Sequence, residues 1–253
     1  MKHARIAYQG LVHEAVVAED GIQLNDGRMV SEDQAVWLPP VKPNTIFTLG
    51  LNYADHAKEL SFSPTQKDPL VFFKGPNTLI GHKASTMRPS DVAFMHYECE
   101  LAVVIGKEAK QIRKEVAYDY VKGYTIANDY ALRDYLENYY RPNLRVKNRD
   151  GCTPIGPWYV DKADVKDPMN LALRTYVNGE KTQEGSTADM LLGIPELIEY
   201  LSGFMTLFPG DIILTGTPKG SIDTAVGDEV VTEIEEIGRL VNTIVGEEAF
   251  LSN

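Results

Sequence analysis

The chain has 253 residues, of which 43% are hydrophobic and 24% charged, a composition typical of a folded globular protein. Its 36 acidic residues outnumber its 25 basic ones, and an acidic surface repels nucleic acid and anionic lipid, so neither is an expected partner. The two cysteines exclude a disulfide framework of the secreted kind. The N-terminus lacks the apolar core of a signal peptide, and no uncharged apolar run is long enough to cross a bilayer, so we expect a cytoplasmic protein.

The first forty residues predict a small domain rich in β-structure. Residues 4–38 consist of short apolar segments separated by turn signals, of which Asp20-Gly21 and Asp26-Gly27 are the strongest because glycine accepts the backbone angles of tight hairpins. The following proline-rich stretch cannot continue a β-ladder and indicates a linker. We therefore predict an N-terminal domain over residues 1–42 and a catalytic domain over residues 43–253.

The rest of the chain mixes strands and helices. Apolar and β-branched runs predict strands at residues 45–49, 70–73, 101–105, 171–177, 212–214 and 229–234. Helical propensity predicts helices at residues 52–60 (with Asn52 as the cap), 130–140 and 194–205. The dipeptide Asn178-Gly179 predicts a hairpin turn. Because regular βαβ alternation is absent, we expect an α+β fold with a large mixed sheet.

Two glutamates, Glu98 and Glu100, stand at the start of an apolar run. In a strand, the two-residue period places both side chains on one face. At an effective dielectric constant near 20, like charges about 4 Å apart repel by roughly 4 kcal/mol, so either one carboxyl holds a proton or a cation lies between them. Oxygen ligands of this kind suit Mg²⁺, Mn²⁺ or Ca²⁺ rather than zinc. Taken alone, such a pair is more often a solvated strand edge, and an isolated Asp129 is more often a helix N-cap.

Several short motifs, taken together and in order, resemble the fumarylacetoacetate hydrolase family. They span most of residues 43–246 and lie at residues 52–59, 72–74, 98–100, 128–134, 147–151 and 215–220. The resemblance implies a mixed β-roll or sandwich catalytic domain of the fumarylacetoacetate hydrolase type, usually dimeric. It also implies Mg²⁺ or Mn²⁺ held by two glutamates and an aspartate, which correspond to Glu98, Glu100 and Asp129.

The resemblance implies roles for further residues as well. Lys147 corresponds to the family's active-site lysine, and His56 and Glu59 correspond to a His–Glu pair on a mobile lid. In a helix these two residues share a face, so the carboxylate can orient and polarise the imidazole. The remaining candidates are substrate-binding residues: Asn52, Lys74, Arg133, Arg141, Gly216 and Thr217.

The tract of residues 134–147 narrows the resemblance to the C-terminal half, or separate C-terminal subunit, of a two-part enzyme of 4-hydroxyphenylacetate (homoprotocatechuate) catabolism. The implied reactions are metal-dependent decarboxylation of 5-oxopent-3-ene-1,2,5-tricarboxylate, isomerisation of 2-hydroxyhepta-2,4-diene-1,7-dioate, or both, through a metal-stabilised dienolate. Members that cleave acylpyruvates typically have arginine where this chain has Leu51. We therefore expect a small oxo-di- or tricarboxylic acid as substrate, and a homodimer, either alone or with a related subunit.

Three alternatives are left open by the sequence. Two lie within the same family: a C–C hydrolase of the acylpyruvate or fumarylacetoacetate type, and an oxaloacetate decarboxylase. The third is a non-catalytic role as the supporting subunit of a two-chain enzyme. The complete set of implied ligands, together with Lys147, His56 and Glu59, argues against the third alternative, because a decayed copy would be expected to lose one of them.

Overall fold

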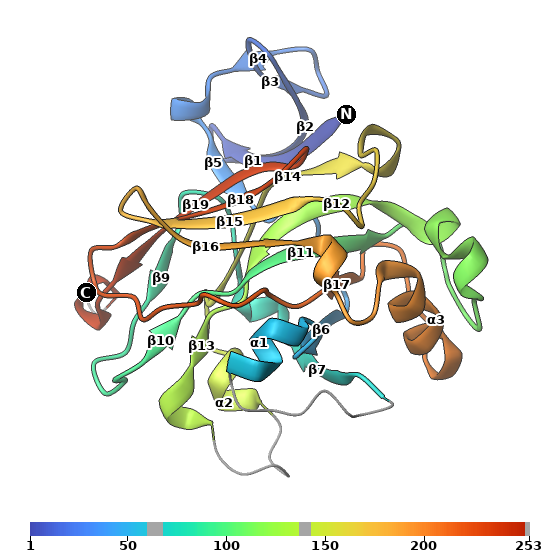
Figure 1. Cartoon of the computed structure of the whole chain (residues 1–253). Helices are drawn as coiled ribbons and strands as arrows, with labels where there is room; N and C mark the ends of the chain where they lie inside the picture. The colour runs from blue at the N-terminus through green and yellow to red at the C-terminus, as the bar shows by residue number, and fades with distance from the viewer. Residues whose placement is uncertain (60–67, 137–142, 251–253) are drawn as a thin grey trace.

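The structure is a computed structural model and describes residues 1–59, 68–136 and 143–250 (Figure 1). Strands predominate among the described residues, and most of them belong to one large mixed sheet. Its strands follow the order β4 (Met29–Val30), β3 (Gly21–Leu24), β2 (Leu11–Ala18), β1 (Lys2–Tyr8), β14 (Thr153–Asp161), β12 (Val121–Asn128), β11 (Cys99–Ile105), β17 (Ile212–Leu214), β6 (Ile46–Gly50) and β7 (Leu70–Lys74), with β5 (Val36–Leu38) beside β1 and β8 (Leu79–Ile80) beside β14.

A second sheet packs across the middle of the large one, in contact with β11, β12 and β14 (Figure 1). It contains β16 (Glu180–Ser186), β15 (Ala172–Val177), β18 (Glu229–Ile234), β19 (Gly238–Val245) and β9 (Ser85–Met87). A small third sheet pairs β10 (Met95–His96) with β13 (Ala131–Leu132). The two larger sheets therefore form the layers of a sandwich, and the third lies at its edge.

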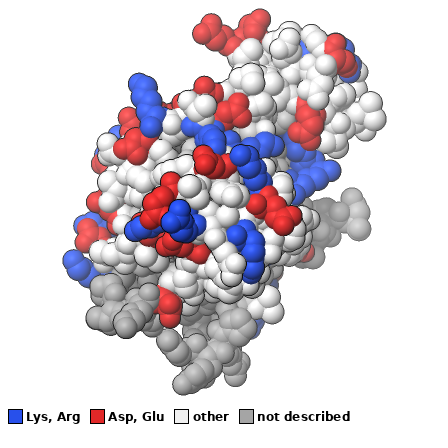
Figure 2. Space-filling view, turned by 90° about the vertical axis from the view of Figure 1, so that its right-hand side faces the viewer, with Lys and Arg blue, Asp and Glu red and all other residues white. Residues whose placement is uncertain are grey.

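The described helices are short. The α-helices are α1 (Ala54–Glu59), α2 (Leu144–Lys147) and α3 (Ile194–Phe204). Single 3-10 segments occur at Glu32–Gln34, Pro76–Thr78, Lys114–Tyr120, Arg133–Tyr135, Lys162–Asp164, Thr187–Asp189 and Glu247–Ala249. Among these described helices, none has the length and apolar character needed to cross a membrane. Figure 2 shows basic and acidic side chains interspersed on one face, so that face offers no extended basic surface for a polyanion.

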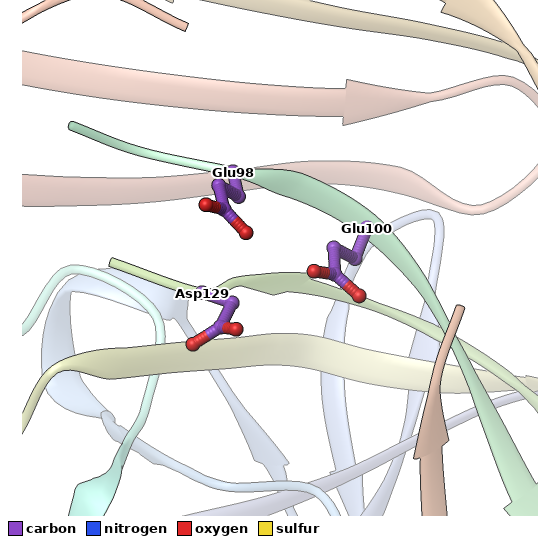
Figure 3. A group of neighbouring side chains, drawn as sticks. All are labelled: Glu98, Glu100 and Asp129. Atoms are coloured by element: carbon purple, nitrogen blue, oxygen red, sulfur yellow. The ribbon is translucent and has the colours of Figure 1, made fainter. Parts of the chain in front are cut away.

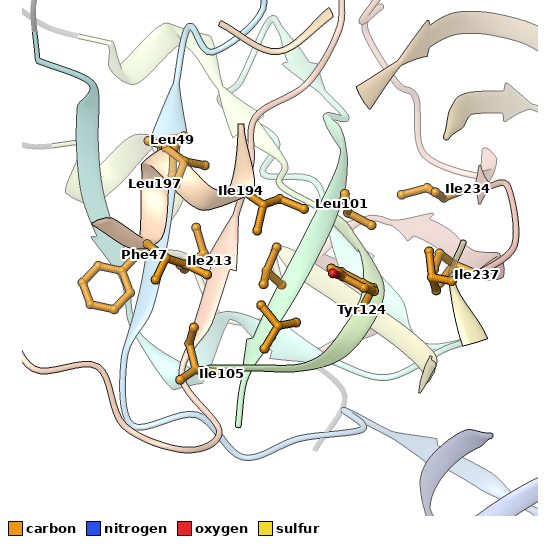
Figure 4. Packing of buried hydrophobic residues seen from close by; sticks show 14 of the residues in the cluster. Phe47, Leu49, Leu101, Ile105, Tyr124, Ile194, Leu197, Ile213, Ile234 and Ile237 are labelled. Carbon is orange, nitrogen blue, oxygen red and sulfur yellow. The ribbon is translucent and has the colours of Figure 1, made fainter. Parts of the chain in front are cut away.

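The main hydrophobic core lies between the two sheets and under α3 (Figure 4). Strand β11 is buried at every position, and its side chains alternate between two cores. Leu101 and Val103 join the main core, whereas Ala102 and Val104 join a second cluster on the other face. A strand covered on both faces requires a continuous apolar run, which is what the sequence has here.

Most of the predicted elements are confirmed, and the mixed fold is confirmed with them. The strands predicted at residues 212–214 and 229–234 have the observed bounds, and α3 ends one residue before its predicted end. The hairpin turn is also confirmed, because Asn178 and Gly179 both have positive φ, at 51° and 83°. The strands β14 and β19 were not predicted.

Two local predictions are wrong. Residues 130–140 do not begin as an α-helix, because Ala131–Leu132 pairs with β10 and a 3-10 turn follows; residues 137–142 lie outside the described part. Asn52 does not cap α1, since its side chain binds two other segments: its amide donates to the carbonyls of Leu192 and Thr215, at 3.0 and 2.9 Å. Tertiary pairing overrides local propensity in both places.

The N-terminal strands continue the large sheet. Strand β1 pairs with β14, with Lys2 opposite Val160 and His3 opposite Tyr159, while β1 to β5 enclose a small core of their own. Proline residues follow β5, and the Pro39 carbonyl accepts a 2.8 Å hydrogen bond from Arg5 Nη1. The division into two domains at residues 42 and 43 stays a prediction.

Candidate active site

Two neighbouring strands bring three carboxylates together (Figure 3). Glu98 directly precedes β11, Glu100 is its second residue, and Asp129 directly follows β12. In the β11–β12 ladder Cys99 lies opposite Asn128, which places the acidic residues of one strand beside that of the other. One oxygen from each carboxylate lies within 4.8 Å of the others, and all three residues are buried. The structure thus brings together the three residues predicted as metal ligands.

Burial makes this arrangement unfavourable without a counter-charge. Burial raises the pKa of Glu100 well above its usual value, and the negative charges of Asp129 and Glu98 raise it further. One oxygen of Glu100, Oε2, accepts a 2.6 Å hydrogen bond from the Gly216 amide. The other, Oε1, is buried and has no hydrogen-bond partner among the described residues. An unsatisfied buried carboxylate oxygen facing two more carboxylates is suited to a cation.

Lys147, the last residue of α2, places its ammonium among the carboxylates. Its Nζ lies 2.7 Å from Glu98 Oε2 and 2.9 Å from Asp129 Oδ2, and it donates a 3.0 Å hydrogen bond to the Asp129 carbonyl. Burial lowers the pKa of Lys147, but the charges of Asp129 and Glu98 outweigh burial and raise it, so the side chain stays charged. In the opposite sense, burial favours neutral Glu98, but Lys147 and Arg133 hold its pKa below the usual value. The lysine therefore offsets only part of the negative charge.

Lys74, at the end of β7, is a second buried ammonium behind the cluster. Its side chain is fully buried and donates to Asp129 Oδ1 and to the Lys147 carbonyl. Cys152 Sγ lies 3.7 Å from the same Nζ. Asp129 is thus contacted by one ammonium on each carboxylate oxygen. Lys74 was predicted to bind substrate, and that role stays a prediction.

The predicted His–Glu pair is present on α1. Glu59 Oε2 lies 3.0 Å from His56 Nδ1, and its other oxygen accepts a 3.3 Å hydrogen bond from the Gly220 amide. Asp55, on the same helix, contacts Lys219 at 3.4 Å. His56 is buried, and its positive charge would help to hold the pKa of Glu98 low, so the imidazole lies near the carboxylates. Helix α1 therefore packs over the site and contacts the loop of residues 215–220.

The loop of residues 215–220 is held in place by buried side chains. The sequence analysis did not connect these side chains with the loop. Gly216 has φ of +92°, and a Cβ built there would lie 3.0 Å from the Cβ of Asn52. Gln183 Nε2 donates hydrogen bonds to Thr217 Oγ1 at 3.0 Å and to the Pro218 carbonyl at 2.8 Å. Gln183 was missed because it lies in β16, far along the chain, and no local pattern marks it.

Arg133, which was predicted to bind substrate, lies beside His96, a second residue that the sequence analysis missed. Arg133 faces the Glu98 oxygen that Lys147 does not contact. Arg133 Nη2 lies 3.7 Å from Glu98 Oε1, and Arg133 Nε donates a 2.6 Å hydrogen bond to His96 Nε2. Burial, followed by the charges of Arg133 and Lys147, lowers the pKa of His96 well below its usual value. His96 stands two residues before Glu98, so the period of a strand could have placed it on the same face. Arg141 lies outside the described residues.

The comparisons with known proteins agree with this fold and site. A family model described as the fumarylacetoacetate (FAA) hydrolase C-terminal domain matches residues 45–245. The chain is 59% identical over 247 residues to the 4-hydroxyphenylacetate degradation bifunctional isomerase/decarboxylase of Salmonella dublin, covering 97% of this chain and 56% of that protein. It spans about half the length of this relative and of two similar relatives from Escherichia coli.

Solved structures resemble the whole chain. The 5-carboxymethyl-2-hydroxymuconate delta-isomerase of Mycobacterium smegmatis matches with a TM-score of 0.87 and 35% identity, over 98% of this chain and 99% of that one. A maleylpyruvate hydrolase from Sphingobium sp. SYK-6, solved with manganese(II) and pyruvate, matches with a TM-score of 0.83 and 27% identity, over 97% and 99%. The relatives named here are an isomerase/decarboxylase, an isomerase and a hydrolase, all of which are enzymes. The chain belongs to the fumarylacetoacetate hydrolase family.

Proposed function

We propose that the chain is a divalent-metal-dependent enzyme that decarboxylates 5-oxopent-3-ene-1,2,5-tricarboxylate, isomerises 2-hydroxyhepta-2,4-diene-1,7-dioate, or does both, in 4-hydroxyphenylacetate catabolism. The observation that carries the proposal is the buried cluster of Glu98, Glu100 and Asp129, with ligand atoms within 4.8 Å of one another. The name of the Salmonella dublin relative supports it. So does a structure of 2-hydroxyhepta-2,4-diene-1,7-dioate isomerase from Mycobacterium marinum, at 32% identity and a TM-score of 0.86.

Glu98, Glu100 and Asp129 would hold the cation, and their oxygen donors fit Mg²⁺ or Mn²⁺. The Sphingobium hydrolase was solved in complex with manganese(II) and pyruvate, which supports this choice of metal and the choice of a 2-oxo acid as substrate. When bound, such a cation supplies Lewis-acid polarisation of the keto group of a 2-oxo acid.

Positive charge in the site would stabilise the negative charge that develops on the substrate during the reaction. In decarboxylation, the bond to the departing carboxylate breaks, CO₂ leaves, and the electron pair moves through the conjugated double bond to the 2-oxo oxygen. The Lys147 ammonium, 2.7 Å from Glu98 Oε2, is a fixed positive charge in a buried site and stabilises this negative charge. Gly216 and Thr217, on the loop beside Glu100, are the proposed contacts of the substrate's carboxylate.

His56 and Glu59 are the proposed proton-transfer pair. The Glu59 carboxylate, 3.0 Å from His56 Nδ1, favours a proton on that nitrogen and leaves Nε2 to give or accept one. Loss of CO₂ leaves a dienolate, and a proton added to its oxygen gives 2-hydroxyhepta-2,4-diene-1,7-dioate. In isomerisation of that dienol, the proton of the 2-hydroxyl group is removed from oxygen and a proton is added to a carbon of the diene. The same histidine can serve both reactions as general acid and base.

The assembly and location are also proposed. We infer a homodimer, either alone or with a related subunit, because edge strand β7 exposes Leu70 and Phe73, at 45% and 54% of their surface. An apolar sheet edge is suited to association. We place the protein in the cytoplasm, where its two free cysteines, Cys99 and Cys152, would stay reduced.

The test is turnover of 5-oxopent-3-ene-1,2,5-tricarboxylate by metal-stripped protein, with and without added Mg²⁺ or Mn²⁺. Release of CO₂ and the ultraviolet absorbance of the dienol are followed together. Metal-dependent CO₂ release supports the decarboxylase, and a metal-dependent absorbance change with the dienedioate supports the isomerase. Cleavage of an acylpyruvate without CO₂ release would overturn the substrate, and metal binding without any turnover would favour a supporting subunit.

A further inference from the structure

His96 and Arg133 are carried by the small sheet at the edge of the site. In the β10–β13 pair, His96 lies opposite Ala131, two residues before Arg133. The Arg133 amide donates a 3.0 Å hydrogen bond to the Phe94 carbonyl. The Asp134 carboxylate accepts hydrogen bonds from the amides of Ala93 and Phe94, at 3.0 and 2.8 Å. Backbone and carboxylate contacts therefore fix the segment that carries His96 to the segment that carries Arg133.

The hydrogen bond between the two side chains has one allowed direction. A guanidinium Nε carries a proton and can only donate, so His96 Nε2, at 2.6 Å from it, must be the acceptor. The proton of the neutral imidazole is then on Nδ1. His96 Nδ1 is buried and has no hydrogen-bond partner among the described residues. The imidazole thus has an unsatisfied polar atom and one strong contact, which is the bond to Arg133.

Among the described residues, neither terminal nitrogen of Arg133 makes a direct hydrogen bond. Nη2 lies 3.7 Å from Glu98 Oε1, which is too long for a direct hydrogen bond. By contrast, Lys147 directly contacts the other Glu98 oxygen at 2.7 Å. The Arg133 side chain is 21% exposed and that of Lys147 7%, so the guanidinium lies on the more open side of Glu98. A planar guanidinium with two free donors binds a carboxylate in a bidentate manner.

A substrate with two carboxylates needs a cation of this kind. The site already contains three protein carboxylates, and the chain has a net charge of −11. The ammonium groups of Lys74 and Lys147 are engaged with Asp129, Glu98 and backbone carbonyls. Among the described cations that contact the cluster, Arg133 is the one whose terminal nitrogens lack a direct protein hydrogen bond.

We propose that His96 is a positioning residue that holds Arg133 by accepting its Nε–H, so that the two Nη groups bind the distal carboxylate of a 2-oxo dicarboxylic acid. This inference rests on the proposed function, in which the 2-oxo acid end of the substrate is bound at Glu98, Glu100 and Asp129. The inference makes His96 and Arg133 together a determinant of selectivity for dicarboxylates over monocarboxylates.

The test compares binding of two ligands that differ only at the far end. Isothermal titration calorimetry on Mn²⁺-loaded protein would use 2-oxoheptanedioate and 2-oxoheptanoate, and we expect tighter binding of the dicarboxylate. His96→Met removes the acceptor at similar volume, whereas in His96→Gln the amide oxygen can still accept from Arg133. We expect His96→Met to weaken binding of the dicarboxylate at least about tenfold and that of the monocarboxylate by less than about twofold. His96→Gln should restore most of the selectivity.

Controls separate positioning from general damage. Mn²⁺ affinity should be the same in wild type, His96→Met and His96→Gln, because a collapsed site would bind the metal less well. Arg133→Met should lose the same selectivity, and adding His96→Met to it should change nothing further, since the histidine acts through the arginine. His13→Gln, on β2, provides a histidine replacement remote from the cluster.

The outcomes distinguish the inference from the function on which it rests. If Mn²⁺-loaded wild type binds both ligands equally, or if His96→Met weakens both equally, the inference is overturned while the proposed function stands. If neither ligand binds the loaded protein, the proposed function itself fails. If His96→Gln behaves like His96→Met, the acceptor role of His96 is refuted.

Discussion

The amide of Gly216 donates a 2.6 Å hydrogen bond to Oε2 of Glu100, which joins the loop of residues 215–220 to one of the two fully buried carboxylates of the cluster. The bond leaves Oε1 facing the other two acids without a partner among the described residues. It depends on a backbone that glycine adopts readily, since φ at Gly216 is +92°. The position of the loop and the direction of the carboxylate are therefore linked.

Gly216→Ala should weaken metal binding. The new Cβ would lie 3.0 Å from the Cβ of Asn52 in a strained backbone conformation, so the loop must shift away from Glu100. Loss of such a supporting contact lowers metal affinity by about tenfold or more. Calorimetric titration with Mn²⁺ measures the metal affinity of the variant and of the wild type. Gly179→Ala is the matched control, because Gly179 also has positive φ, +83°, but has no atom within 4 Å of its Cβ position. Equal affinities in the two variants would contradict the prediction.

Glu98→Gln should abolish metal-dependent turnover while leaving the fold intact. The amide keeps the size of the side chain but removes the charge that Lys147 contacts and that would help to hold the proposed cation. Turnover with added Mg²⁺ or Mn²⁺ and the circular dichroism spectrum give the two readouts. Glu180→Gln, at an exposed position of β16, should retain wild-type activity. Unchanged turnover in Glu98→Gln would refute the assignment of Glu98 as a ligand.

Lys74→Met should destabilise the metal-free protein strongly. The ammonium is fully buried against Asp129, and removing it leaves a buried carboxylate with one cation fewer. Breaking a buried ion pair in this way costs roughly 3–5 kcal/mol in the free energy of unfolding. Urea denaturation measures the change. Lys83→Met, which removes a contact between two half-exposed side chains, should cost no more than about 1 kcal/mol. Similar losses in both variants would show that Lys74 does not compensate Asp129.

His82 should make the free energy of unfolding depend on pH. Burial lowers the pKa of His82 from 6.5 to about 4, and its Nδ1 accepts a 3.0 Å hydrogen bond from the Val241 amide, which requires the unprotonated nitrogen. His82 binds a proton more readily in the unfolded chain than in the folded protein. The contribution of neutral His82 to the free energy of unfolding is therefore complete above pH 6.5. It is lost as the pH falls from 6.5 towards 4, by at most roughly 3 kcal/mol.

Replacement of His82 by asparagine isolates this contribution. In His82→Asn the amide oxygen can still accept from Val241 but does not titrate, so the unfolding free energy should fall less steeply between pH 6.5 and 4. Thermal or urea unfolding over that range measures the slope. His13→Gln, on β2, should keep the wild-type slope. A slope for His82→Asn equal to that of wild type would mean that His82 does not control the acid sensitivity.

The sequence predicts those elements whose residue pattern follows from burial. It misses elements that form because they pair with a segment distant in the chain. The part of β11 that was predicted, residues 101–105, is a continuous apolar run because the strand is buried at every position. The helix predicted after Asp129 fails because Ala131 and Leu132 pair with β10, which no local pattern reveals. The pair Glu98 and Glu100 is visible in the sequence, but the approach of Asp129 follows from the β11–β12 register. Only the resemblance to a family connected them beforehand.

The burial of β11 at every position has a consequence for how such proteins diversify. The candidate metal ligands Glu98 and Glu100 lie at the start of this strand, whose successive side chains pack into two different cores, so the strand as a whole tolerates little change. His56 and Arg133 instead belong to a short helix and a short turn. Descendants of one ancestor can therefore exchange the groups that select a substrate, one at a time, and inherit the same centre of reactivity unchanged.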